Sequence, residues 1–230
     1  MGENVRLLQD VCCYAANHAV PTALLSLDQG KAFDRVEWSF LEKVLEKMGF
    51  GPSFRRWVSL LYTSVNSAVS VNGHLSDAFP VSRGVRQGCP LSSLLYVLVA
   101  ETMACSVQAD ARIDCFPLPC SNCWVKIFQY ADDTTVLVCS DDYLVPLFQF
   151  FARYERASSA RPNLRKCCGL LLGPWWSRPP ESLPIQLKWS TEIIRVLGCR
   201  IHPAGTQDWG PLLGELATLV DAWKVRHLSF

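Results

Sequence analysis

The sequence predicts an α+β protein in which helices back an antiparallel sheet. Segments with helical spacing of apolar residues are interleaved with short runs rich in β-branched and aromatic residues. Several of these runs are joined by tight turns, which connect antiparallel strands. The chain has 230 residues, half of them hydrophobic, which suits one large domain, or one and a half, with a buried core.

The charge content narrows the class of protein. Charged residues make up 19% of the chain, below the usual share of about a quarter, so disorder is not predicted. The net charge of +1 does not by itself indicate nucleic-acid binding. A nucleic-acid enzyme of this charge needs its basic residues concentrated on one face.

The first third of the chain predicts a helix, a strand and two further helices. Apolar residues at helical spacing predict a helix over 5–19, and the apolar run 22–27 predicts a strand that ends at Asp28. Asp34 and Glu37 have the spacing of a capping box and predict the start of a helix that Gly49 closes. The predicted apolar face of that helix consists of Phe40, Leu41, Val44, Leu45 and Met48.

A second set of elements follows from position 52. Pro52 begins a helix to about Tyr62, with Phe54, Val58 and Leu61 facing inward. The runs 68–71 and 78–81 predict strands, and Asn72-Gly73 between them is a strong hairpin signal. A glycine-containing polar segment over 83–88 leads into a helix over 91–107, which we expect to be buried because residues 94–104 are apolar almost all round.

The centre of the chain predicts a hairpin that carries two carboxylates. The runs 124–128 and 134–138 predict strands, and between them lies Tyr130-Ala131-Asp132-Asp133. Two adjacent like charges at a turn cost repulsion and desolvation unless a cation compensates them, and a divalent metal is the simplest candidate. If the strand ending at Asp28 lies beside this hairpin, the three carboxylates converge and suit two Mg²⁺ ions about 3.5–4 Å apart.

Ordinary structural roles compete with this interpretation. An Asp-Asp pair is commonly a solvated turn, Asp28 taken alone fits a strand end, and Asp34 fits a helix cap.

The remaining third predicts shorter elements. Asp141-Asp142 predicts the cap of a helix to about Ala157, and 169–172 predicts a short strand. Residues 173–184 form a proline-rich surface connection, and the runs 185–189 and 193–201 predict a further hairpin. Residues 211–230 are predicted to be helical.

Three motifs together resemble the reverse transcriptase of non-LTR retrotransposons, the long interspersed elements. They are Asp28-Gln-Gly-Lys-Ala-Phe-Asp34, Arg83-Gly-Val-Arg-Gln-Gly-Cys-Pro-Leu-Ser92 and Tyr130-Ala-Asp-Asp133, and their order and spacing agree with the family. The resemblance implies a polymerase palm over 21–190 with an inserted fingers segment, after a residual fingers helix over 1–20. It also implies a primer-grip hairpin over 191–201, so that the reverse transcriptase domain spans 1–201, and the start of a thumb or a C-terminal extension over 202–230. Most of the fingers and thumb are expected to be missing.

The resemblance assigns roles to individual residues. It implies that Asp28 and Asp132 are the principal metal ligands of two Mg²⁺ ions, with Asp133 secondary and Mn²⁺ as an alternative ion. Phe33 matches the side chain that excludes a ribonucleotide 2′-OH, although core packing also explains it. The other matched positions are Gln87 and Gly88 beside the incoming nucleotide, Tyr130 and Ala131 beside the primer terminus, and Leu197 and Gly198 on the primer backbone.

Basic residues complete the implied site. Lys166 matches a proton donor to the departing pyrophosphate, and its plain alternative is a solvated loop lysine. Candidate phosphate contacts are Arg83, Arg86, Arg161, Arg165 and Lys166, each of which surface solvation also explains. Positions 30, 93, 159, 162 and 167 depart from the family pattern, but none of them removes a metal ligand.

Cysteine usage predicts a reducing compartment. The 11 cysteines are an odd number, and the N-terminus lacks a signal sequence, so an intracellular setting, nucleus or cytoplasm, is expected. Cys115, Cys120 and Cys123 lack a nearby fourth ligand, so zinc is not expected. The longest apolar run, 94–100, is too short to span a bilayer, so no membrane partner is expected.

The predicted function is RNA-directed DNA synthesis, in which a dNTP is added to the 3′-OH of a DNA primer on an RNA template. The alternative is a catalytically inactive retrotransposon remnant that is at most a nucleic-acid- or protein-binding module. A metal-dependent nuclease that uses the same carboxylates is a third interpretation, in which the Gln87-Gly88 loop has no evident use. The sequence does not indicate an oligomeric state.

Overall fold

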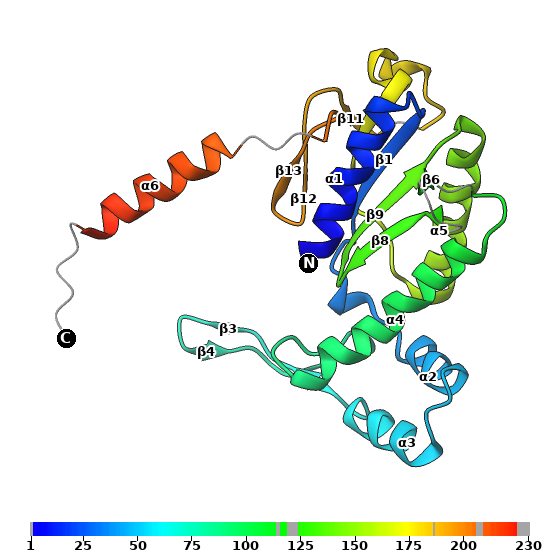
Figure 1. Ribbon diagram of the computed structural model, residues 1–230. Helices are drawn as coiled ribbons and strands as arrows, with labels where there is room; N and C mark the ends of the chain where they lie inside the picture. The colour runs from blue at the N-terminus through cyan, green and yellow to red at the C-terminus, as the bar shows by residue number, and fades with distance from the viewer. Residues whose placement is uncertain (1, 114–115, 119–123, 186, 206–208, 225–230) are drawn as a thin grey trace.

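The computed structural model describes residues 2–113, 116–118, 124–185, 187–205 and 209–224. Its centre is a five-stranded sheet with the strand order β11-β10-β1-β9-β8 (Figure 1). The strands are β1 Thr22–Asp28, β8 Ile127–Tyr130, β9 Asp133–Val138, β10 Cys168–Leu172 and β11 Lys188–Ser190. All neighbouring strands are antiparallel except β10 and β11, which are parallel. The predicted α+β class is therefore confirmed.

Helices and a small hairpin cover both faces of this sheet. On one face lie α1 Gly2–Asn17 and the hairpin of β12 Ile194–Val196 and β13 Cys199–Ile201 (Figure 1). On the other face lie the second half of α4 Pro90–Ala109 and the helix α5 Leu144–Ser158. The central strand β1 alternates between the two cores, with Leu24 facing α1 and Leu25 facing α4 and α5, so it is apolar on both sides.

A second, smaller core lies at the other end of α4. There α2 Trp38–Lys47 and α3 Pro52–Leu61 pack with the first half of α4 around Leu41, Leu45 and Leu95. From α3 the chain forms a narrow ribbon of two short strand pairs (Figure 1). These are β2 Asn66–Ser67 with β5 Phe79–Pro80, and β3 Ser70–Val71 with β4 His74–Leu75. The remaining elements are β6 Phe116–Pro117 paired with β7 Trp124–Val125, four short 3₁₀ turns, and α6 Gly210–Lys224.

The ribbon confirms one prediction and corrects another. Asn72 and Gly73 have φ angles of +50° and +83°, so they form the predicted tight turn between two paired strands. The run 78–81 does not pair with 68–71, because Phe79 and Pro80 pair with residues 66–67 instead.

Two predicted helix caps are wrong. Asp34 lies in a 3₁₀ turn, Phe33–Arg35, and α2 begins only at Trp38, with no side-chain cap from Glu37. The Glu37 carboxylate accepts a hydrogen bond from Ser159 at 3.0 Å, so a contact distant in sequence replaces the local cap. At α5, Ser140 accepts from the Asp142 amide, while Asp141 pairs with Arg178.

The predicted hairpin of 185–189 with 193–201 is also wrong. Residues 188–190 join the central sheet as its parallel edge strand, and 194–201 form a hairpin of their own. Several residues expected to face inward are exposed instead, because α3 and the start of α4 each pack on one side only and Met48 is the C-cap residue of α2. They are Met48, Phe54, Leu61, Leu94 and Val97, which are 38%, 38%, 57%, 63% and 50% exposed.

α4 is the one helix among the described residues that is long and apolar enough to cross a membrane by length and composition. In this fold its apolar residues serve the two cores, with Leu95, Tyr96, Val99, Met103 and Val107 all buried. Burial of these side chains accounts for part of the apolar composition of the helix, whereas Leu94 and Val97 are exposed.

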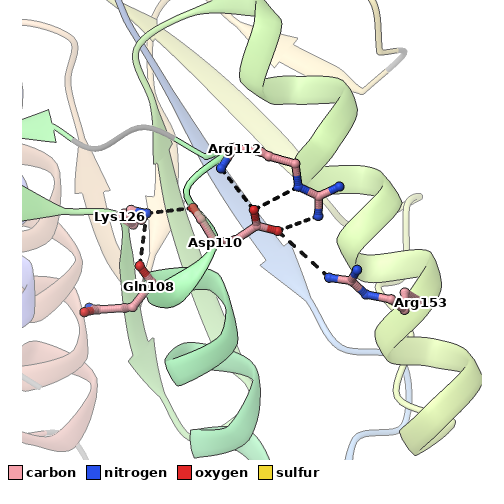
Figure 2. Close-up of polar contacts among 5 residues, drawn as sticks. All are labelled: Gln108, Asp110, Arg112, Lys126 and Arg153. Atoms are coloured by element: carbon pink, nitrogen blue, oxygen red, sulfur yellow. Dashed lines mark hydrogen bonds and ion pairs between the residues drawn. The ribbon is translucent and has the colours of Figure 1, made fainter.

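The C-terminal end of α4 is fixed by a buried lysine (Figure 2). Lys126, at 8% exposure, donates hydrogen bonds from Nζ to the carbonyl oxygens of Gln108 at 3.0 Å and Asp110 at 2.9 Å. A cation at the carbonyl end of a helix meets both its unpaired acceptors and its dipole. The Asp110 carboxylate in turn accepts two hydrogen bonds from the Arg112 guanidinium and lies 3.9 Å from that of Arg153. The Arg112 hydrogen bond is the main reason why the pKa of Asp110 falls to about 2.

Candidate active site

The three predicted acidic residues come together at one edge of the central sheet. Asp28 is the last residue of β1, and Asp133 is the first residue of the adjacent antiparallel strand β9. In this register the two residues lie directly opposite each other. Asp132 lies in the two-residue turn between β8 and β9, in which Ala131 has a φ of +54°. The predicted adjacency of the first strand and the carboxylate hairpin is therefore confirmed.

The carboxylates act on one another electrostatically. Burial raises the pKa of Asp133, and the charges of Asp132 and Asp28 raise it further. In the described part of the chain, Lys166 is the cation that pairs with this group: its Nζ lies 3.8 Å from Asp28 Oδ1, and its side chain is 67% exposed. An exposed lysine at this distance compensates little of the charge.

These residues suit a hard divalent cation, which prefers carboxylate oxygens and tolerates few protein ligands. Among the residues that the structure describes, no three His, Cys, Asp or Glu side chains are close enough to hold a metal ion. The fit therefore rests on the type of the donor atoms and on the mutual repulsion of the carboxylates, which a bound cation relieves.

Backbone hydrogen bonds fix the segment that carries Lys166 against the end of β1. The Asn163 amide donates to the Asp28 carbonyl at 2.8 Å, and the Gly30 amide donates to the Arg161 carbonyl at 3.1 Å. The Lys166 amide then donates to the Asn163 carbonyl at 2.8 Å. Two predicted site residues, Asp28 and Lys166, are thus brought together although they are far apart in sequence.

Two residues that the sequence analysis missed hold Phe33 in place. The Phe33 ring stacks on Tyr96 with a centroid distance of 4.6 Å and an interplanar angle of 16°. The Tyr96 hydroxyl donates to Gln29 Oε1 at 3.1 Å, and Gln29 directly follows Asp28. Burial raises the pKa of Tyr96, and the nearby charges of Asp132 and Asp133 add to the effect. In the sequence, the sign that Tyr96 has a special role is that it is a phenol within the otherwise aliphatic run 94–100.

The polar loop before α4 is tied to the Phe33 turn. The Val85 amide donates to the Phe33 carbonyl and the Gly84 amide to the Val36 carbonyl, both at 2.8 Å. Gly84 has a φ of +94°, and an added Cβ would lie 3.0 Å from the Asp34 carbonyl oxygen, so this position requires glycine.

The predicted nucleotide-contacting residues share one cavity. Phe33, Gln87 and Gly88 line a space of about 420 Å³, together with Arg86, Cys89, Pro90 and Ser93. The adjacent hairpin turn presents Tyr130, which is 48% exposed. Leu197 and Gly198 form the turn of the β12–β13 hairpin, with φ angles of +51° and +79°, and Leu197 packs against the α1 side of the sheet.

The predicted phosphate-binding residues are solvent-accessible. Arg83 is 51% exposed and lies 3.5 Å from Glu37, while Arg161 is 58% exposed and lies 3.8 Å from Glu155. Arg86 and Arg165 are exposed as well. Cys115, Cys120 and Cys123, the residues considered for zinc, lie outside the described part of the chain.

The mostly antiparallel sheet carries one carboxylate at the end of its central strand and two more on the adjoining hairpin, which is the arrangement that the three sequence motifs predict. Residues 3–201 match the sequence profile of the family described as reverse transcriptase (RNA-dependent DNA polymerase). The chain therefore belongs to the reverse transcriptase family.

Curated relatives agree with this assignment and narrow it. The "Transposon TX1 uncharacterized 149 kDa protein" of Xenopus laevis is 37% identical over 96% of this chain. The "Retrovirus-related Pol polyprotein from type-1 retrotransposable element R2" of Popillia japonica is 26% identical over 62% of it. The chain spans only 17% and 20% of these two relatives. The predicted similarity to non-LTR retrotransposon reverse transcriptases is confirmed, and the chain corresponds to a fragment of their reverse transcriptase domain.

Solved structures support the fold. A telomerase of Candida tropicalis in complex with a telomeric RNA fragment superposes with a TM-score of 0.60 at 13% identity, over 89% of this chain and 32% of that one. A telomerase of Candida albicans gives a TM-score of 0.59 at 12% identity. At this identity the similarity concerns the fold alone.

Proposed function

We propose that this chain carries out RNA-directed DNA synthesis, adding dNTPs to the 3′-OH of a DNA primer on an RNA template. The observation that carries the proposal is the position of Asp28 directly opposite Asp133, with Asp132 in the adjoining turn. Burial raises the pKa of Asp133, and the charges of Asp132 and Asp28 raise it further, which supports a cation at this edge of the sheet.

In this proposal Asp28 and Asp132 are the principal ligands of two Mg²⁺ ions, which Mn²⁺ can replace, and Asp133 is secondary. Two Mg²⁺ ions held by these carboxylates would supply activation of the attacking 3′-oxygen and charge stabilisation for the leaving pyrophosphate. Lys166 supplies a proton to the pyrophosphate, a role supported by its position 3.8 Å from Asp28 at the open edge of the site.

The remaining residues position the nucleic acids. Phe33 limits the space at the sugar of the incoming dNTP, and its stacking on a buried Tyr96 supports a fixed ring position. Gln87 and Gly88 lie beside the same nucleotide, because they share the cavity with Phe33. Tyr130 and Ala131 contact the primer terminus, Leu197 and Gly198 contact the primer backbone, and the exposed arginines bind phosphates.

We further propose a division of the chain into functional parts. Residues 21–190 are the palm with an inserted fingers segment, which we place at α3 and the ribbon. Residues 1–20, 191–201 and 202–230 are a fingers helix, the primer grip and the start of the thumb or an extension. In the described part of the chain none of the eight cysteines forms a disulfide, which supports a reducing intracellular compartment.

The test is primer extension on an RNA template with a DNA primer, comparing the chain with Asp132→Asn and Asp142→Asn. Asp142 is an exposed aspartate in the 3₁₀ turn before α5, so its variant is a matched control. We expect Mg²⁺-dependent incorporation that Asp132→Asn abolishes and Asp142→Asn retains. We also expect Mg²⁺ to raise the melting temperature of the parent chain and of Asp142→Asn, but not of Asp132→Asn.

Two results would contradict the proposal. A folded parent chain that incorporates no dNTP would indicate an inactive remnant. Cleavage of labelled nucleic acid without dNTPs, lost in Asp132→Asn, would indicate a nuclease instead.

A further inference from the structure

A second and larger cavity adjoins the first, since Arg86, Gln87 and Cys89 line both. Its volume is about 630 Å³, and it is bounded by α3, the base of the ribbon, the Gln87-Gly88 loop and the first turn of α4. Aromatic side chains, among them Trp38, Tyr62 and Phe79, form part of its wall. Cys89 and Ser92, from the start of α4, lie in the same wall. A thiol among aromatic groups in a cavity of this size suits a small aromatic ligand.

Cys89 is placed to act as a nucleophile. It is the N-cap residue of the 20-residue helix α4 and is partly accessible to solvent. The backbone amides of Leu91 and Ser92 lower the pKa of its thiol, and Arg86 contributes in the same direction. The thiolate is the reactive form of cysteine, and a helix N-terminus favours it.

Ser92 offers a buried hydroxyl beside this thiol. The residue is 1% exposed, and in the part of the chain that the structure describes its Oγ has no partner at hydrogen-bonding geometry. It nevertheless lies close enough to the Cys89 thiol to contribute to the lowering of its pKa. A buried hydroxyl without a partner costs free energy, which an acceptor oxygen on a ligand would recover.

We propose that this cavity is a binding site for small aromatic α,β-unsaturated carbonyl compounds, to which Cys89 adds covalently. The Cys89 sulfur forms a bond with the β-carbon, and the π-electron pair of the C=C bond moves toward the carbonyl to give an enolate. The Ser92 hydroxyl donates to the enolate oxygen, and the α-carbon then takes a proton from water. The proton that the thiol releases to solvent balances the proton that the α-carbon takes from water. The addition therefore needs neither an oxidant nor a leaving group.

The position of Cys89 also connects the two cavities. Together with Arg86 and Gln87, it lines both the 630 Å³ cavity and the 420 Å³ cavity that contains Phe33. An adduct on Cys89 is therefore expected to displace the Gln87-Gly88 loop. Such a displacement should inhibit primer extension, and only this inhibition rests on the proposed function.

The test treats the folded full chain with a limiting amount of N-phenylmaleimide at pH 7 and measures the modification of each cysteine by peptide mass spectrometry. Cys105 is the internal control, because it lies on the same helix and is exposed, while burial and Glu101 raise the pKa of its thiol. We expect Cys89 to react several-fold faster than Cys105, because the pKa of the Cys89 thiol is lowered while that of the Cys105 thiol is raised. Equal rates, or a faster Cys105, would overturn the proposal whether or not the chain is a polymerase.

Three variants separate the contribution of the cavity from simple thiol reactivity. Ser92→Ala should slow the reaction at Cys89 several-fold and leave Cys105 unchanged. Phe79→Ala should reduce the preference of Cys89 for N-phenylmaleimide over N-ethylmaleimide. Leu75→Ala, in the same ribbon and 74% exposed, should leave that preference unchanged. A preference that survives Phe79→Ala, in a variant with the parent circular dichroism spectrum, would refute binding in the cavity.

Discussion

The hydrogen bonds of Lys126 lead to a quantitative prediction about stability. In Lys126→Met the apolar stem remains, but the carbonyl oxygens of Gln108 and Asp110 lose the ammonium group that they share. A buried acceptor left unpaired costs about 1–3 kcal/mol, and the lost interaction with the helix dipole adds about 0.3–1 kcal/mol. Gln108 is exposed and Asp110 half-buried, so water compensates in part and the lower values apply. We expect the free energy of unfolding to fall by about 2 kcal/mol.

The assay is urea denaturation followed by circular dichroism, with Lys47→Met as the matched control. Lys47 is an exposed lysine in the last turn of α2, so the same substitution there should cost less than about 0.5 kcal/mol. A loss below about 0.5 kcal/mol in Lys126→Met would refute the reasoning, because it would mean that the two hydrogen bonds contribute no net stability.

Two further predictions concern the site and the acid stability. If the proposed function is correct, Tyr96→Leu should lower the preference for dNTP over rNTP by about 2–10-fold in single-nucleotide kinetics, the equivalent of the 0.5–1.5 kcal/mol of a stacked aromatic pair. Tyr96→Phe keeps the ring and should retain the preference; a preference unchanged in Tyr96→Leu would show that the stack with Phe33 has no role in sugar selection. Because the folded pKa of Asp110, about 2, lies below its ordinary value of 3.8, its contribution is present above pH 4 and is lost as the pH falls toward 2. Urea unfolding at pH 5 and pH 2.5 should therefore show a smaller acid-induced loss of stability in Asp110→Asn than in the parent, by at most about 2 kcal/mol, and equal losses would contradict the assignment.

The metal-ligand candidates were predictable because they depend on short-range signals. Asp28 and Asp133 each stand at the end of an apolar strand, and residues 131–132 form the tight turn that brings Asp132 beside Asp133. To predict that the carboxylates converge, it was enough to assume that the two strands are neighbours in the sheet. They are neighbours, and the register of the pair places Asp28 opposite Asp133.

The errors arose where a local pattern had a distant partner. Glu37 has the spacing of a capping residue, but its carboxylate accepts a hydrogen bond from Ser159, 122 positions further along the chain. The strand at 188–190 has a strand-like sequence, yet nothing nearby in the chain indicates that its partner is the parallel strand β10. Short polar and strand motifs therefore indicate what a residue can do, whereas the tertiary fold decides which partner it meets.

Tyr96 also has distant partners that its local sequence does not indicate, and it connects the parts of the site. Tyr96 belongs to a helix whose apolar sequence predicts burial and nothing more. Its exposure of 2% confirms that burial. Its ring and hydroxyl, however, contact Phe33 and Gln29, which lie on either side of the turn after Asp28. A buried phenol that contacts both ends of this turn restrains the end of β1 and the Phe33 ring at once. The helix core and the proposed catalytic edge are therefore one packed unit, and a substitution in the core at position 96 is expected to alter the geometry of the site.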